Sequence, residues 1–143
     1  GPIGQMYVAC LRMLGAREII AVEPIESRLA LSPKMGATAT INPAKTDVVA
    51  EVSRITGGAM ADVVIEAVGH ADQVFNLAQS LVKHSGRLLF FGVPPETVDG
   101  IALRDLFYRN VTVHTSVNPD FSRDFPLAMR WPPTSVAHLH LPP

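Results

Sequence analysis

The sequence has 143 residues, enough for one domain of ordinary size and too few for two. Apolar residues make up 48% of the sequence and charged residues 17%, a balance typical of a packed globular core and not of a disordered chain. The 12 Lys and Arg against 13 Asp and Glu leave no basic surplus for a nucleic acid or an anionic membrane, and no apolar run approaches the roughly 18 residues of a membrane span.

Helix-like and strand-like segments alternate along the first 117 residues. The predicted order is a helix over 3–14, a strand over 18–23, a helix over 25–35, a strand over 38–42, a helix between Asp47 and Gly57, a strand over 62–68, a helix over 71–83, a strand over 87–93 and a strand over 111–117.

The first two predicted helices carry specific expectations. Ile3, Tyr7, Cys10 and Leu14 recur at helical spacing, so we expect them to form an apolar stripe that buries the cysteine. In the second helix Pro33 lacks an N–H, and its ring clashes one turn back, so we expect this helix to end early or kink.

The strand segments VVIEAV and RLLFFGV are apolar at successive positions instead of alternating, which is typical of strands covered by helices on both faces. Repeated strand, helix and strand units indicate parallel strands joined by right-handed crossovers. The predicted fold is therefore a doubly wound α/β (Rossmann) sheet, mostly parallel, with helices on both faces. Ligands bind such sheets at the carboxyl ends of the strands.

A candidate dinucleotide motif opens the sequence. Gly1, Pro2, Ile3 and Gly4 precede a helix, and the next strand ends at Glu23, 19 positions after Gly4. The N-terminus of a helix favours a pyrophosphate, and an acidic residue about 20 positions on accepts hydrogen bonds from the adenosine ribose. Gly1 and Gly4 would be the second and third glycines of the fingerprint, so we expect its first glycine and first strand to precede residue 1.

Glu23 also bears on the choice between NAD and NADP. A carboxylate there can hold both ribose hydroxyls of NAD and repels the 2′-phosphate of NADP. Arg28 leaves the alternative open because a guanidinium could bind that phosphate. The acidic end of the strand favours NAD.

The sequence resembles the coenzyme-binding domain of the zinc-dependent alcohol dehydrogenases, a family of medium-chain dehydrogenases. The similarity covers residues 1 to about 130 and rests on GPIG, AVEPIESRLALSPKMGATATINP, GGAMADVVIEAVG and GRLLFFGVPPE. The resemblance implies that Gly1, Pro2, Ile3 and Gly4 line the pyrophosphate, that Glu23 holds the adenosine ribose and that Arg28 lies beside the adenosine.

The same resemblance implies a nicotinamide side of the site. Val68 and Gly69 would lie under the nicotinamide-side ribose. Backbone groups near the nicotinamide would come from Phe91, Gly92, Val93, Thr115 and Val117.

The implied reaction transfers a hydride between an alcohol or polyol and NAD, with a zinc ion as Lewis acid on the alcohol oxygen. The zinc ligands of the family come from another domain, so the resemblance gives this sequence no catalytic residue and no metal ligand. We expect residues 1–130 to be a cofactor domain truncated at its N-terminus and inactive alone. We also expect a small-molecule alcohol substrate and a dimeric or tetrameric cytoplasmic parent enzyme.

Three other functions stay open. A zinc-free quinone reductase of the same superfamily would prefer NADPH. A redox-sensing module would bind NAD without catalysis, and a methyltransferase shares the glycine turn and the acidic strand end. We expect zinc-ligand residues upstream of Gly1 if the enzyme hypothesis holds.

The remaining candidate residues have structural interpretations. We expect His114 to be a packed core histidine, and Glu66 to support the loop after its strand. His70 could contact a phosphate or cap the next helix. The tail from Trp131 onward has four prolines in thirteen residues, so we expect irregular structure over 131–143 and a frame shift or mispredicted gene end. His138 and His140 lie on that tail and are not expected to bind metal.

Overall fold

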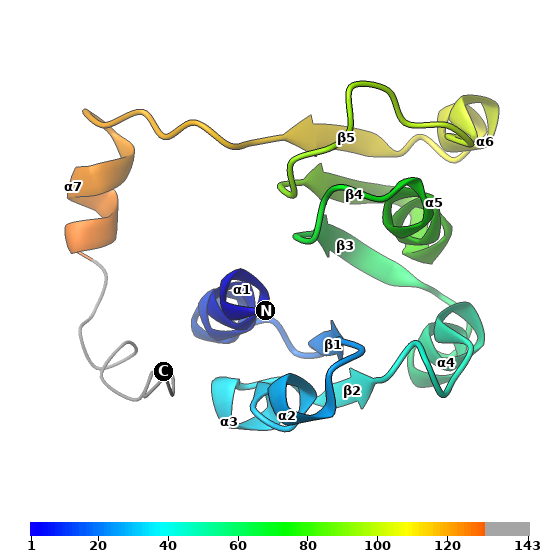
Figure 1. Cartoon of the computed structure of the whole chain (residues 1–143), viewed down its shortest axis with the longest axis horizontal. Coiled ribbons are helices and arrows are strands. Elements are labelled where there is room, and N and C mark those ends of the chain that lie inside the picture. Colours follow the sequence, from blue (N-terminus) through cyan, green and yellow to red (C-terminus); the bar gives the residue numbers. More distant parts are fainter. Residues whose placement is uncertain (131–143) are drawn as a thin grey trace. The chain divides into compact units, whose positions relative to one another are not determined.

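All paired strands of the computed structural model, which describes residues 1–130, run parallel (Figure 1). One sheet pairs β1 (Ile20–Val22) with β2 (Ala39–Ile41), and a second has the order β3 (Ala61–Glu66), β4 (Val82–Phe90), β5 (Thr112–Thr115). The helices are α1 (Pro2–Met13), α2 (Glu26–Leu29), α3 (Ser32–Met35), α4 (Val48–Ile55), α5 (Asp72–Leu81), α6 (Leu103–Tyr108) and α7 (Asp124–Met129). Parallel strands alternating with flanking helices confirm the doubly wound α/β class.

The chain divides into two compact units. Among the described residues, the first holds 1–46 together with 118–130, and the second holds 47–117. Each unit is described by itself.

In the first unit the predicted helix over 25–35 is interrupted, as Pro33 led us to expect. α2 ends at Leu29, and α3 begins at Ser32 with Pro33 in its first turn. Gly36 then ends α3 with φ +110°, a left-handed conformation that suits glycine. A Cβ at Gly36 would lie 2.8 Å from Cγ of Arg12, so its absence also lets α1 approach this turn.

The buried face of α1 differs from the predicted stripe. Ile3 and Leu14 are 47% and 69% exposed, whereas Gln5 and Val8 are buried. Gln5 is buried because its amide donates hydrogen bonds to the α2–α3 segment. The apolar periodicity therefore identified the helix and gave the wrong face.

In the second unit α5 packs against β3 and β4. The rings of Phe75 and Phe90 lie 4.8 Å apart between centroids, and Leu88 is fully buried. Val63 of β3 is 46% exposed, so the expectation that both faces of β3 are covered was wrong. The predicted helix over 71–83 ends early, at Leu81, and β4 begins at Val82, before the predicted start of this strand at residue 87.

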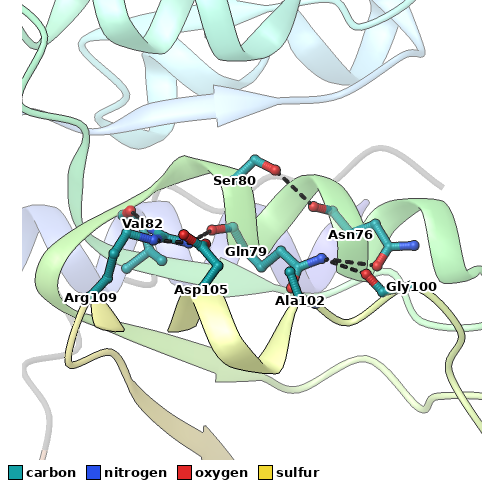
Figure 2. A network of polar contacts seen from close by, with 8 residues as sticks. All are labelled: Asn76, Gln79, Ser80, Val82, Gly100, Ala102, Asp105 and Arg109. Carbon is teal, nitrogen blue, oxygen red and sulfur yellow. Dashed lines mark hydrogen bonds and ion pairs between the residues drawn. The ribbon is translucent and has the colours of Figure 1, made fainter. Parts of the chain in front are cut away.

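A polar network attaches α6 and the loop before it to α5 (Figure 2). Gln79 donates to the carbonyl oxygen of Gly100 at 3.1 Å and accepts from the N–H of Ala102 at 2.9 Å. Arg109 donates to the carbonyl oxygen of Gln79, in the last turn of α5, at 2.9 Å and to that of Val82, directly after α5, at 2.6 Å. This network fixes the approach to β5, the strand that follows α6.

Among residues 1–130, no helix is both long and apolar enough to cross a bilayer. The expected irregular tail over 131–143, with His138 and His140, lies outside the described residues.

Candidate functional site

The first turn of α1 has the chemistry of an anion site. Gly1 precedes the helix and Pro2 is its first residue, and the turn contains no acidic side chain. The N–H groups of a first helical turn have no partners within the helix, and the helix dipole adds partial positive charge. A Cβ built at Gly1 or Gly4 would meet no atom within 4 Å, so the chain's own packing does not require either glycine. The space beside these backbone groups is open to a ligand.

Glu23 is the first residue after β1 and is only 8% exposed. Its Oε1 accepts from the N–H of Ile25 at 3.1 Å, and its Oε2 accepts from the amino group of Gly1 at 2.5 Å. The two ends of the predicted motif therefore meet. Each carboxylate oxygen can accept a second hydrogen bond, so a sugar hydroxyl is a chemically suitable further donor.

The ionisation of Glu23 reflects this environment. Burial alone would raise the pKa of its carboxyl group. The hydrogen bonds from the backbone nitrogen of Gly1 and from the Ile25 N–H, together with the nearby Arg28, outweigh burial, so the net pKa is lowered. The carboxylate is thus held in its charged form, which repels a phosphate.

Arg28 lies in α2 with an exposed side chain. Its carbonyl oxygen accepts from Nε2 of Gln5 at 3.0 Å, and Nε2 also donates to Oγ of Ser32 at 2.9 Å. Sequence reasoning missed Gln5. The available signal was a polar side chain directly after Gly4, on the face of α1 away from the apolar stripe.

In the second unit Glu66 organises the loop that follows β3. Its Oε1 accepts from the N–H groups of Val68 and Gly69 at 2.7 and 2.8 Å. This confirms the expected support of the loop by Glu66. Gly69 has φ +70°, and a Cβ there would lie 2.4 Å from the carbonyl oxygen of Val93.

The loop after β4 lies against the loop after β3. Phe91 and Gly92 donate to the carbonyl oxygen of Glu66 at 2.9 and 3.1 Å. His70 donates its backbone N–H to the carbonyl oxygen of Val93 at 2.9 Å. The structure thus brings the five predicted residues of these two loops together at the carboxyl ends of β3 and β4. These five residues are Val68, Gly69, Phe91, Gly92 and Val93.

The last two predicted residues follow β5. Thr115 is the final residue of β5 and pairs with Phe90, the last residue of β4, so it reaches the same sheet edge. Val117 lies two positions further and is 60% exposed.

Several other candidates are corrected or resolved. His114 is exposed in β5, so the expectation of a packed core histidine was wrong; β5 is an edge strand in the described sheet. Cys10 is half-buried, not fully buried. His70 does not cap α5 with its side chain and instead adopts φ +63°. Within residues 1–130, no three His, Cys, Asp or Glu side chains gather into a group that could hold a metal ion.

Comparison with known proteins gives a consistent result. The family model described as "Zinc-binding dehydrogenase" matches residues 2–132. An L-threonine 3-dehydrogenase of Caldanaerobacter subterraneus subsp. tengcongensis is 34% identical over 113 residues, which are 79% of this chain and 32% of that relative. The chain thus spans about a third of the length of this curated relative.

Solved structures have the same fold. Alcohol dehydrogenase TADH from Thermus sp. ATN1 superposes with a TM-score of 0.82 at 27% identity, covering 97% of this chain and 39% of that one. A protein from Sinorhizobium meliloti 1021, described as a zinc-binding dehydrogenase and solved bound to NADP, superposes with a TM-score of 0.77 at 30% identity. That match covers 87% of this chain and 37% of the other.

Proposed function

The chain belongs to the zinc-binding dehydrogenase family, and we propose that residues 1–130 are the cofactor-binding domain of such an enzyme, specific for NAD. The single observation that carries the proposal is the meeting of Gly1 and Glu23. The backbone nitrogen of Gly1, at the open N-terminus of α1, lies 2.5 Å from Oε2 of the charged Glu23 carboxylate. A pyrophosphate and the ribose next to it in a dinucleotide need these two groups side by side.

The adenosine side uses the first unit. The amide groups of Ile3 and Gly4 would bind pyrophosphate oxygens, with Gly1 and Pro2 lining the same turn. The carboxylate of Glu23 would accept hydrogen bonds from the ribose hydroxyls, and the exposed Arg28 would lie beside the adenosine.

The nicotinamide side uses the second unit. The loop with Val68 and Gly69 would support the second ribose. Phe91, Gly92, Val93, Thr115 and Val117 would offer backbone groups to the nicotinamide, which supplies hydride chemistry when bound. The hydrogen bonds that already fix these two loops support a preorganised site.

The preference for NAD over NADP rests on Glu23. A buried carboxylate with a lowered pKa stays charged and repels a 2′-phosphate. The relative from Sinorhizobium meliloti binds NADP, so the choice must be measured for this chain, and Arg28 is the residue that would favour the phosphate.

The whole enzyme would transfer a hydride between a small-molecule alcohol or polyol and NAD. Because the described residues offer no group of three metal ligands, any zinc would be held by residues outside them. We also propose a cytoplasmic dimer or tetramer. The single cysteine of the sequence favours a reducing compartment.

The test is a fluorescence titration of the complete gene product with NADH and with NADPH. We expect tighter binding of NADH. Glu23→Ala should lower the affinity for NADH about tenfold and reduce the preference for NADH over NADPH. Arg28→Ala should further lower the affinity for NADPH only if the guanidinium of Arg28 binds the 2′-phosphate of NADPH. Tighter NADPH binding by the unchanged protein would overturn the NAD assignment and favour the quinone reductase alternative. NADH binding without alcohol turnover would favour the redox sensor.

A further inference from the structure

Glu66 holds both the loop after β3 and the loop after β4, whereas the sequence predicted support of the first loop alone. Its side chain is 3% exposed at the end of β3. Through Oε1 it holds the N–H groups of Val68 and Gly69, and through its backbone carbonyl it holds those of Phe91 and Gly92. One residue therefore anchors both loops.

The packing leaves this arrangement little freedom. A Cβ at Gly92 would lie 2.6 Å from Oε2 of Glu66 and 2.2 Å from the backbone nitrogen of Gly69. The second carboxylate oxygen thus lies against Gly92, where a larger residue does not fit. Movement of the carboxylate would shift the loop after β3, and Gly92 of the next loop packs closely against both the carboxylate and that loop.

The second carboxyl oxygen of Glu66 is costly for the fold alone. Among the described residues this buried Oε2 has no hydrogen-bond partner, and an unpaired buried acceptor destabilises a fold. An apolar residue at the end of β3 would avoid that cost. The presence of a carboxylate here is therefore better explained by its hydrogen bonds from the N–H groups of Val68 and Gly69 than by packing.

We propose that Glu66 is a positioning residue of the cofactor site. Its carboxylate sets the backbone of Val68 and Gly69, in the loop that packs against the loop after β4, for the nicotinamide half of the dinucleotide. This inference rests on the proposed function and adds a residue to it. Glu66 itself does not touch the cofactor. Its removal should weaken only the part of the binding energy that the nicotinamide half contributes.

The experiment compares two ligands in the complete gene product. NADH carries both halves, whereas ADP carries the adenosine and the diphosphate and lacks both the second ribose and the nicotinamide. For Glu66→Ala we expect the Kd of NADH to rise about tenfold while that of ADP changes less than about twofold. Glu66→Gln keeps an oxygen that can accept from Val68 and Gly69, so it should restore most of the NADH affinity.

Gln79→Ala is the matched control. Gln79 is also a buried polar side chain of the second unit and also holds a loop, at Gly100 and Ala102. Because that loop has no proposed cofactor contact, the ratio of the two Kd values should stay at the wild-type ratio. If Glu66→Ala does not fold, Glu66→Asp replaces it. Aspartate keeps the charge and withdraws the carboxylate by about 1.5 Å.

The outcomes separate the two claims. If the unchanged protein binds neither ligand, the proposed function fails, and this inference fails with it. If it binds both, and the Glu66 variants weaken both equally or neither, Glu66 is a structural residue and only the positioning role is overturned.

Discussion

Gly4 lies in the first turn of α1, where a side chain would be sterically harmless to the protein itself. A Cβ there meets nothing within 4 Å. Alanine is the better helix former, so Gly4→Ala should stabilise the fold by up to about 1 kcal/mol. If a pyrophosphate lies against this turn, the same methyl group should lower NADH affinity. Denaturant unfolding and NADH titration of one protein preparation measure both effects.

Gly4→Ala is a specific test because it should raise the stability of the fold while lowering the affinity for NADH. A gain in stability with unchanged NADH affinity would mean that no ligand approaches this turn. Gly58→Ala is the matched control. A Cβ at Gly58 also meets nothing within 4 Å, but its φ is +88°, so alanine should cost stability and leave NADH binding unchanged.

Glu23 gives a pH dependence whose sign follows from its lowered pKa. The carboxyl group of an unfolded chain titrates near 4.5. In the folded protein burial would raise this pKa, but the hydrogen bonds from the Gly1 nitrogen and the Ile25 N–H and the nearby Arg28 lower it overall. Its stabilising contribution is therefore complete above that value and is lost as the pH falls through the lower, folded pKa.

We expect Glu23→Gln to reduce the loss of stability between about pH 6 and about pH 3. The measurement is the denaturant midpoint of both proteins at each pH. An identical loss in the variant and the unchanged protein would show that the contacts that lower the pKa of Glu23 do not form in solution.

At the scale of single elements, local chemistry was predictable and packing direction was not. Pro33 interrupts the helix over 25–35, as the sequence predicts. The helix expected after Asp47 forms as α4, and Asp47 caps it by accepting a 3.1 Å hydrogen bond from the N–H of Ala50. The face of α1 could not be predicted, because Gln5 is buried by partners 23 and 27 positions away. Apolar periodicity contains no information about such polar pairing.

Arg109 is the element-scale residue with the clearest stability role. Its guanidinium binds the carbonyl groups of Gln79, in the last turn of α5, and of Val82, directly after α5, and pairs with Asp105 (Figure 2). Arg109→Ala should destabilise the protein by about 1–3 kcal/mol and speed amide hydrogen exchange at the end of α5. Arg104→Ala is the control, because Arg104 is exposed and lies over the Tyr108 ring. An equal effect of both variants would contradict the capping role.

At the scale of the whole molecule, strand pairing was only partly foreseeable. The parallel order and the meeting of the β3 and β4 loops follow from the alternation of elements. The exposure of β5 and of Val63 does not, because it depends on which strands and helices are present to cover them. The apolar pattern of a strand predicts that its faces are covered, but it does not identify the strands and helices that cover them.

Among the described residues, β1 pairs only with β2, and β3 pairs only with β4. Each therefore has one edge of backbone groups outside any described sheet, and unpaired groups are costly if buried. We expect the chain expressed by itself to be unstable, with a broad unfolding profile and binding of a hydrophobic dye. A cooperative transition near about 45–65 °C would contradict this expectation.

The most direct test of the account is amide hydrogen exchange of the complete gene product with and without NADH. Binding should protect residues 1–5 and 20–25 of the first unit and residues 66–70 and 91–93 of the second. The amides of α4, which has no proposed cofactor contact, should exchange as before. Unchanged exchange at both Gly4 and Gly69 under saturating NADH would contradict the claim that this chain binds the dinucleotide.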